Sequence, residues 1–183
     1  MQRDTILCMA CKDETSAAVE RFVTEAQLFA QWATAATDED AFAVRSGLLR
    51  LTHLYSAGLE LPVSSGDIET DKSISVRVDD AEWKQVFAHA AASLPFDLYG
   101  EVYDPLPVPP EEPVVGSLAD DIADVYRDVV TGLRHFQADR RAAALWEWTF
   151  SLQNHWGQHA TSAIRALHCW LATNDPQRLS AEE

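Results

Sequence analysis

The sequence predicts an all-α fold, namely a helical bundle of about five helices with a long C-terminal helical hairpin and a proline-rich connecting loop. First, apolar residues recur three and four positions apart over most of the chain, which is the period of an amphipathic helix. Second, most of the eight prolines lie within residues 95–116, where they disfavour regular structure. Third, 183 residues, 47% of them apolar, suffice to bury one hydrophobic core, so we expect a single domain over 1–183.

Three helices are predicted in the first half of the chain. Apolar positions at helical spacing predict the first over residues 13–36. Residues 37–40 have the composition of a break followed by a new N-cap, and the second helix is expected to end near Gly58. Asp79 and Glu82 have the spacing of a capping box, which predicts the start of a third helix.

Residues 63–78 are the least helical segment. Ile74, Val76 and Val78 alternate with polar neighbours, which is the period of a half-buried strand. No partner strand is evident in the sequence. We therefore expect either an irregular loop, which we favour, or an edge strand that pairs across a homodimer.

The C-terminal half is predicted to form the helical hairpin. Ser117 is expected to cap a fourth helix that runs to Phe136, and Asp139 is expected to begin the last and longest helix, of about 30 residues. Gly157 lies in the middle of that helix, where it costs about 1 kcal/mol relative to alanine. We therefore expect another group to pack closely against the backbone at Gly157.

Charge and cysteine content limit the classes of function. The net charge is −15, from 29 acidic and 14 basic residues, and no basic stripe is present. We expect neither nucleic acid nor an anionic membrane as a partner, and a basic protein as the partner that this charge favours. The sequence lacks the apolar runs of a signal peptide or a membrane span, and its three cysteines argue against a disulfide framework. These features predict a cytoplasmic protein, with flexible ends over 1–12 and 173–183.

Aspartate and histidine residues in the last two helices are the candidate metal ligands. At 100° per residue, Asp121 and Asp124 lie on one flank of the fourth helix. His155 and His159 are four residues apart, so their imidazoles lie one turn from each other on one face of the last helix. Two histidines at this spacing can share one divalent metal, and carboxylates from the facing helix can complete its coordination.

A structural role for the same residues is the alternative. Histidines at the edge of an apolar face are often part of the packing, held by hydrogen bonds. The zinc-protease pattern places a glutamate directly after the first histidine, whereas Trp156 follows His155, so that protease class is excluded. We therefore expect no cofactor, with a divalent metal as the alternative.

Several further residues are candidates for binding or for the core. Tyr103, Asp128, Trp148 and Trp156 are the candidates for a binding or conformational surface, although the tryptophans favour a place in the core. Cys8 and Cys11 have the spacing of a zinc knuckle but lack a second pair of ligands, so they are interpreted as small buriable residues. Glycine-rich phosphate loops and the serine nucleophile elbow are both missing from the sequence.

Two C-terminal motifs carry a resemblance to a known family. The stretches PVVGSLADDIADVYRDVVTGL and ALWEWTFSLQNHWGQHATSAIRALH, with the weaker LTHLYSAGLELP and FDLYGEVYDPL, resemble the bacterial family called domain of unknown function 5063. The similarity covers roughly residues 20–170. It implies a small, mostly helical bacterial protein and implies no particular activity. The family-like positions are Asp120, Asp121, Asp124, Tyr126, Asp128, Trp148, His155, Trp156, Gly157 and His159.

Three functions are compatible with these observations. The one favoured from sequence is a non-catalytic binding or adaptor protein that uses its acidic surface. Eight acids and one base between Glu101 and Asp128 support that reading. The alternative is a helical-bundle metalloprotein, such as a hydrolase, with Asp121, Asp124, His155 and His159 around the ion. The third is an acidic immunity-type inhibitor of a basic toxin.

Overall fold

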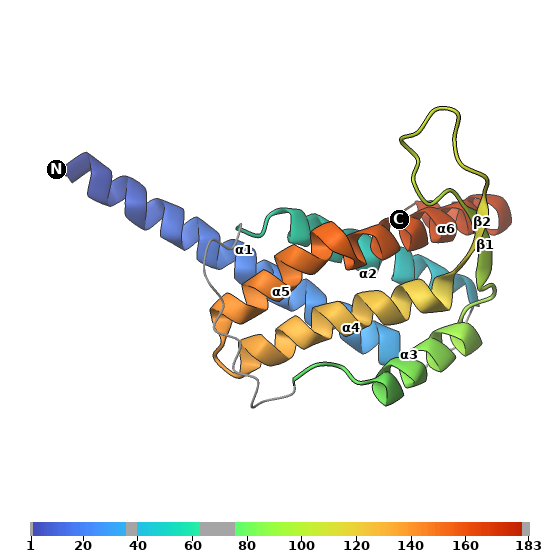
Figure 1. The fold of residues 1–183 in the computed structure, drawn as a ribbon, viewed down its shortest axis with the longest axis horizontal. Helices are drawn as coiled ribbons and strands as arrows, with labels where there is room; N and C mark the ends of the chain where they lie inside the picture. Colours follow the sequence, from blue (N-terminus) through green and yellow to red (C-terminus); the bar gives the residue numbers. More distant parts are fainter. Residues whose placement is uncertain (1, 36–39, 63–75, 181–183) are drawn as a thin grey trace.

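Six α-helices and one small antiparallel sheet form the fold of residues 2–35, 40–62 and 76–180, the part that this computed structural model describes (Figure 1). The helical-bundle prediction is confirmed, with six helices in place of about five. The elements are α1 (Gln2–Thr34), α2 (Asp40–Leu59), α3 (Asp80–Ser93), β1 (Leu98–Glu101), β2 (Val114–Ser117), α4 (Leu118–Gln137), α5 (Arg141–Asn154), α6 (Trp156–Asn174) and the 3-10 helix η1 (Pro176–Leu179).

Helix α4 lies at the centre of the bundle, with α3 on one side and α5 and α6 on the other (Figure 1). Its N-terminus forms as predicted, because the Ser117 side chain accepts a hydrogen bond from the backbone N–H of Asp120. The apolar stripe of α4 is fully buried against the large side chains of the other helices. The core includes Phe22, Phe29, Leu51, Leu54, Leu118, Ile122, Val125, Val129, Trp148, Trp156 and Leu167.

The start of α3 is only partly the predicted capping box. Asp79 caps the helix by accepting from the N–H groups of Ala81 and Glu82. Glu82 does not reach back to the cap. Arg134 Nη2 instead donates to both oxygens of the Glu82 carboxylate, each at 2.7 Å, and the Tyr126 hydroxyl donates to Oε1 at 2.9 Å. A charged partner on α4 therefore outcompetes the neutral cap N–H for this side chain.

The proline-rich loop contains regular structure at its two ends, where the sequence predicted none. Strands β1 and β2 pair antiparallel, with Leu98 opposite Ser117 and Glu101 opposite Val114. Both strands lack proline, so their N–H groups can join the ladder of hydrogen bonds. The prolines of this loop lie at position 95 and in the irregular segment between the strands, residues 102–113, which we call the strap. Of the other segment proposed as a strand, residues 63–75 lie outside the described part, and 76–78 are not in a strand.

The last predicted helix is broken into two, which corrects the prediction of one continuous helix. Helix α5 ends and α6 begins at His155, whose φ of −151° and ψ of −81° are not helical. A Cβ placed on Gly157 would lie 2.1 Å from the backbone oxygen of Leu152. The close neighbour expected at Gly157 is therefore the preceding turn of the same chain. The hairpin itself is present, since α5 and α6 follow one another along α4 (Figure 1).

The ends of the chain were predicted to be flexible, and that stays a prediction. The first turns of α1 extend beyond the other helices in Figure 1. Near the other end, Arg45 Nε donates to the backbone oxygen of Arg178 in η1 at 2.8 Å. Within the described residues, no helix has a stretch long and apolar enough to cross a membrane.

Candidate metal centre

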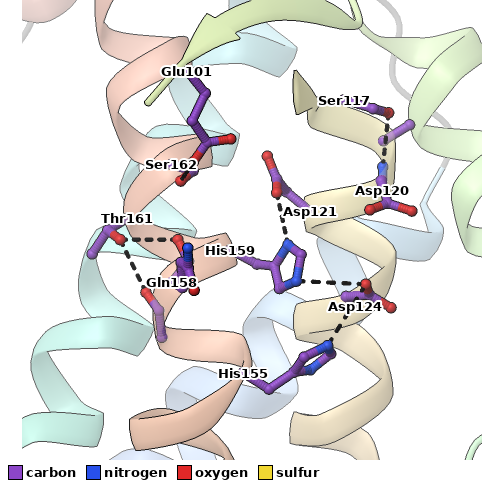
Figure 2. Close-up of polar contacts among 12 residues, drawn as sticks. Glu101, Ser117, Asp120, Asp121, Asp124, His155, Gln158, His159, Thr161 and Ser162 are labelled. Carbon is purple, nitrogen blue, oxygen red and sulfur yellow. Dashed lines mark hydrogen bonds and ion pairs between the residues drawn. The ribbon is translucent and has the colours of Figure 1, made fainter. Parts of the chain in front are cut away.

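The four predicted ligand residues come together between α4 and the start of α6 (Figure 2). Asp121 and Asp124 lie on successive turns of α4 and face α6. His155 occupies the break between α5 and α6, and His159 lies in the first turn of α6. The break therefore sets the position of the first histidine relative to the second.

Each histidine is held through its Nδ1 by a carboxylate on α4. His159 Nδ1 lies 2.8 Å from Asp121 Oδ1, and His155 Nδ1 lies 2.8 Å from Asp128 Oδ2. An ionised carboxylate can only accept, so Nδ1 carries the proton in each ring. The Nε2 atoms are then the ones left to bind another group.

Both Nε2 atoms face the same carboxylate, Asp124. Asp124 Oδ2 lies 3.6 Å from His159 Nε2 and 3.9 Å from His155 Nε2. One ligand atom from each of these three residues lies within 4.8 Å of the other two. Among the residues described, Asp124, His155 and His159 thus form a set of two nitrogens and one oxygen that could hold a metal ion.

Asp121 and Asp128 have a supporting position rather than a place in this ligand set. The sequence groups Asp121 with the ligands, but its Oδ1 is bonded to His159 and its Oδ2 accepts from the Tyr99 hydroxyl at 2.5 Å. The sequence makes Asp128 a candidate for a binding surface, yet Asp128 is buried and bonded to His155. This carboxylate–histidine arrangement orients imidazole ligands in many metal sites.

A chain of hydrogen-bonded polar groups extends from Asp121 to strand β1. Burial raises the pKa of the Tyr99 hydroxyl, and its hydrogen bond to Asp121 raises it further. The same hydroxyl lies 3.3 Å from Glu101, which also accepts from the Ser162 hydroxyl (Figure 2). Burial raises the pKa of Asp121, while the bonds from His159 and Tyr99 oppose that rise. Strand β1 thereby braces the outer side of the site.

Negative charge around His159 favours its protonated form. Burial alone would lower the pKa of His159, but the hydrogen bond to Asp121 and the charges of Asp121, Asp124 and Asp120 together raise it. Without a metal, a proton on Nε2 would meet the Asp124 carboxylate. A divalent cation at the same point would satisfy the same negative charge.

The Asp124 carboxylate is held in place through Oδ1, the oxygen that does not face the histidines. Trp83 Nε1 donates to Asp124 Oδ1 at 2.7 Å, and Arg127 Nη1 lies 3.8 Å from the same atom. Oδ2 remains directed at the two histidines. Trp83, Tyr99 and Glu101 lie outside the two motif-bearing helices, and no spacing in the sequence indicates their role.

The remaining candidates fall into three groups. Trp148 and Trp156 are fully buried, in agreement with their assignment to the core, and so they offer no free surface. Tyr103 is 66% exposed and belongs to the strap. The side chains of Cys8 and Cys11 lie outside the described part of the chain.

The fold and the site together define a helical bundle with a two-histidine, one-carboxylate cluster between two of its helices. The chain belongs to the family described as domain of unknown function (DUF5063), whose model matches residues 13–173. It is also similar to the crystal structure of protein BF1032 from Bacteroides fragilis, with a TM-score of 0.69 and 23% sequence identity over 91% of this chain and 96% of that one. That likeness shows the shared fold. No curated protein matches the sequence.

Proposed function

We propose that this protein binds a divalent transition-metal ion through Asp124, His155 Nε2 and His159 Nε2. One observation carries the proposal: each imidazole is anchored at Nδ1 by its own aspartate, and both Nε2 atoms then point at a third carboxylate. Histidines used only for packing need one hydrogen-bond partner each. Here a second carboxylate faces each ring, which is the arrangement expected of metal ligands and their supporting shell.

The donor set narrows the class of metal. Two imidazole nitrogens and one carboxylate suit zinc, iron(II) and similar first-row ions better than magnesium or calcium, which prefer oxygen ligands. Metal–ligand bonds of about 2.0–2.2 Å place two ligand atoms no further than about 4.4 Å apart. The three ligand atoms lie within 4.8 Å of one another, so at most a small inward movement is needed. His155 is the ring with most freedom to make it, because its side chain is 44% exposed.

Three protein ligands leave coordination positions for water or a substrate. If the ion is zinc, it would lower the pKa of a bound water to near neutrality and so supply a nucleophile for hydrolysis. The buried supporting carboxylates would hold the imidazoles in place during such a reaction. Hydrolysis is therefore the reaction class to screen first.

Elemental analysis tests metal binding directly. The protein is purified without a metal-affinity column, and we expect about one equivalent of zinc or iron per chain. The double variant His155→Ala/His159→Ala should lose the metal, whereas His168→Ala, an exposed histidine further along α6, should retain it. Wild type that remains metal-free after dialysis against micromolar zinc, iron(II), cobalt or manganese would refute the proposal.

Docking of a basic partner on the strap is a second candidate function. Residues 102–113 expose large apolar side chains beside acids, with Leu106 at 84% and Val108 at 93% exposure, next to Glu111 and Glu112. Such a surface suits a partner that carries both apolar and basic groups, including a basic toxin. Fluorescence anisotropy with a labelled peptide of alternating lysine and valine tests it. If the double variant Leu106→Ser/Val108→Ser binds the peptide as tightly as the wild type does, this assignment is refuted.

A further inference from the structure

A second feature adjoins the metal centre, namely a pocket of about 530 Å³ formed between α4, α5 and the segment before α3. His155, one of the proposed ligands, forms part of its wall. The other lining residues used below include Arg77, Arg127, Asp128, Trp146, Glu147 and Phe150, with His135 at the far end of the α4 side.

Arg127 is the unusual member of this pocket. Its side chain is only 23% exposed, yet within the described residues it makes no hydrogen bond, and its Nε is buried without a partner. Its two Nη atoms lie 3.8 Å from Asp124 and 4.0 Å from Asp80, which is too long for hydrogen bonds. The guanidinium is held in place by the ring of Trp83, 5.1 Å away.

Arg134, two turns further along α4, shows what a satisfied arginine looks like in this protein. Its Nη2 donates to both carboxylate oxygens of Glu82, each at 2.7 Å. Buried polar groups are nearly always hydrogen-bonded, and a guanidinium matches carboxylate or phosphate in a bidentate manner. Arg127 has two carboxylates in ion-pair range but no direct hydrogen bond, so its guanidinium is available to an acidic group from outside the chain.

The rest of the pocket adds an apolar wall and a histidine. Trp146 and Phe150 stack with their rings 4.7 Å apart and 10° from parallel, and Phe150 is 50% exposed. His135 Nδ1 is buried and, within the described residues, has no partner. Burial lowers the pKa of His135, and the nearby charge of Arg140 lowers it further, which favours the neutral ring.

Charges in the pocket indicate where an anion would bind. Asp128 lies on the α4 side and is already bonded to His155. Burial raises the pKa of Glu147, and the charge of Asp128 adds to that rise, while Arg77 opposes it. The cationic positions are therefore Arg127 and Arg77, with the aromatic pair beside them.

We infer that this pocket binds a small organic oxyanion, a phosphate ester or a carboxylate, with its charged head on Arg127 and its apolar part against Trp146 and Phe150. The head would lie near the metal centre, because His155 belongs to both sites and Arg127 Nη1 is 3.8 Å from Asp124 Oδ1, the oxygen that does not face the histidines. The inference thus names the substrate class of the proposed metal centre and, in this respect, rests on the proposed function.

Calorimetric titration with phenyl phosphate and, separately, benzoate tests the inference. Both are titrated into metal-loaded and metal-free wild type, Arg127→Gln, Arg127→Lys and the control Arg141→Gln, an exposed arginine of α5. At least one probe should bind wild type. Arg127→Gln should weaken that binding by about tenfold or more, Arg127→Lys by less, and Arg141→Gln by no more than about twofold. The stronger probe identifies the head group.

A second variant tests the apolar wall without touching the cation. Phe150→Ala should weaken phenyl phosphate by a few-fold and leave inorganic phosphate unchanged, since only the former has a ring to pack. Circular dichroism on each variant establishes that it is folded. Should Arg127→Gln fail to fold, the Arg127→Lys and Phe150→Ala series decide the question.

Failure of this inference and failure of the metal proposal are separable. Metal-loaded wild type that binds neither probe, or binds one equally well in folded Arg127→Gln, would overturn the pocket assignment alone. If the protein takes up no metal, the titrations into metal-free protein decide whether the pocket assignment holds. Binding that depends on Arg127 then supports the pocket, and its absence overturns it.

Discussion

Asp121 and Asp128 lie seven residues apart on α4, and each holds one imidazole by its Nδ1 atom. Their spacing is two helical turns, whereas His155 and His159 are four residues apart across a bend. Asp124 lies between the two aspartates and faces both rings. The three carboxylates therefore differ in role although they differ little in sequence context, because only the middle one points at both Nε2 atoms.

Asp128→Asn should weaken metal binding without abolishing it. The amide can donate to Nδ1, which favours the tautomer whose proton sits on Nε2, the atom needed for the metal. Loss of such a supporting carboxylate typically costs about 10- to 100-fold in affinity. Competition against a chelating dye measures the change. Asp124→Asn should cost more, because it alters a ligand, and an equal effect of both substitutions would contradict the division of roles.

Gly157→Ala should destabilise the fold. A Cβ at Gly157 would lie 2.1 Å from the backbone oxygen of Leu152, which cannot move aside as a flexible side chain could. Overpacking of this kind costs about 1–3 kcal/mol. Urea unfolding measures it, with Gly100→Ala as the control because a Cβ there meets nothing within 4 Å. Equal stability of the two variants would show that the bend relaxes freely.

At the level of elements, α3 is joined to α4 by the carboxylate of Glu82. It accepts from Arg134 and Tyr126, and the adjacent Trp83 reaches Asp124 in the metal centre. Burial, followed by the hydrogen bond to Glu82, raises the pKa of Tyr126 to about 12. Helix α3 thus supports the site without supplying a ligand.

Glu82→Gln should loosen this junction. The amide keeps one acceptor but loses the charge that pairs with the half-buried Arg134 guanidinium, so we expect a loss of about 1–2 kcal/mol in the free energy of unfolding. The exposed neighbour Lys84→Gln should change it by less than about 0.5 kcal/mol. Chemical denaturation of both variants makes the comparison. Indistinguishable midpoints would mean that the ion pair contributes nothing net.

The elements that sequence predicted well are those with long apolar periodicity or a clear cap. Helix α4 is the best example, since its stripe and its Ser117 cap both appear in the structure. The break at His155 was missed because the apolar spacing continues through it and no proline marks it. Gly157 was the one local signal. Strands β1 and β2 are too short for alternation to distinguish them from loop.

The candidate site was predictable in part for the same reason. Helical spacing alone places the aspartates of α4 on one flank. It also predicted that the two histidines would lie near each other, although it assumed a continuous helix that the structure breaks at His155. It does not say which carboxylate faces which nitrogen, because that depends on the rotation of two helices about their axes. Trp83 and Tyr99 come from elements far away in the chain, so only the tertiary fold brings them to the site.

For the whole molecule, the effect of metal on stability should depend on pH. The raised pKa of His159 means that the folded protein holds this proton more tightly than the unfolded chain does. In the metal-free protein, the resulting stability is fully present below the unfolded pKa of about 6.5 and is lost as pH rises through the folded pKa.

Metal binding depends on pH in the opposite sense, because the ion must displace any proton on His159 Nε2. The rise in melting temperature caused by saturating zinc should therefore be larger at pH 8 than at pH 6. Thermal unfolding with and without zinc across this range provides the measurement, and His159→Gln is the control. A shift that is independent of pH in wild type would place the metal elsewhere.

The bend at His155 has a consequence for motion. The two proposed ligands lie at the bend and one turn beyond it, while their third partner lies on the straight helix α4. An ion bound by all three ligand residues would link the bend between α5 and α6 to helix α4 and so restrict its motion. Amide hydrogens around this joint should then exchange with solvent more slowly in the loaded protein, while those at the far end of α6 keep their rate.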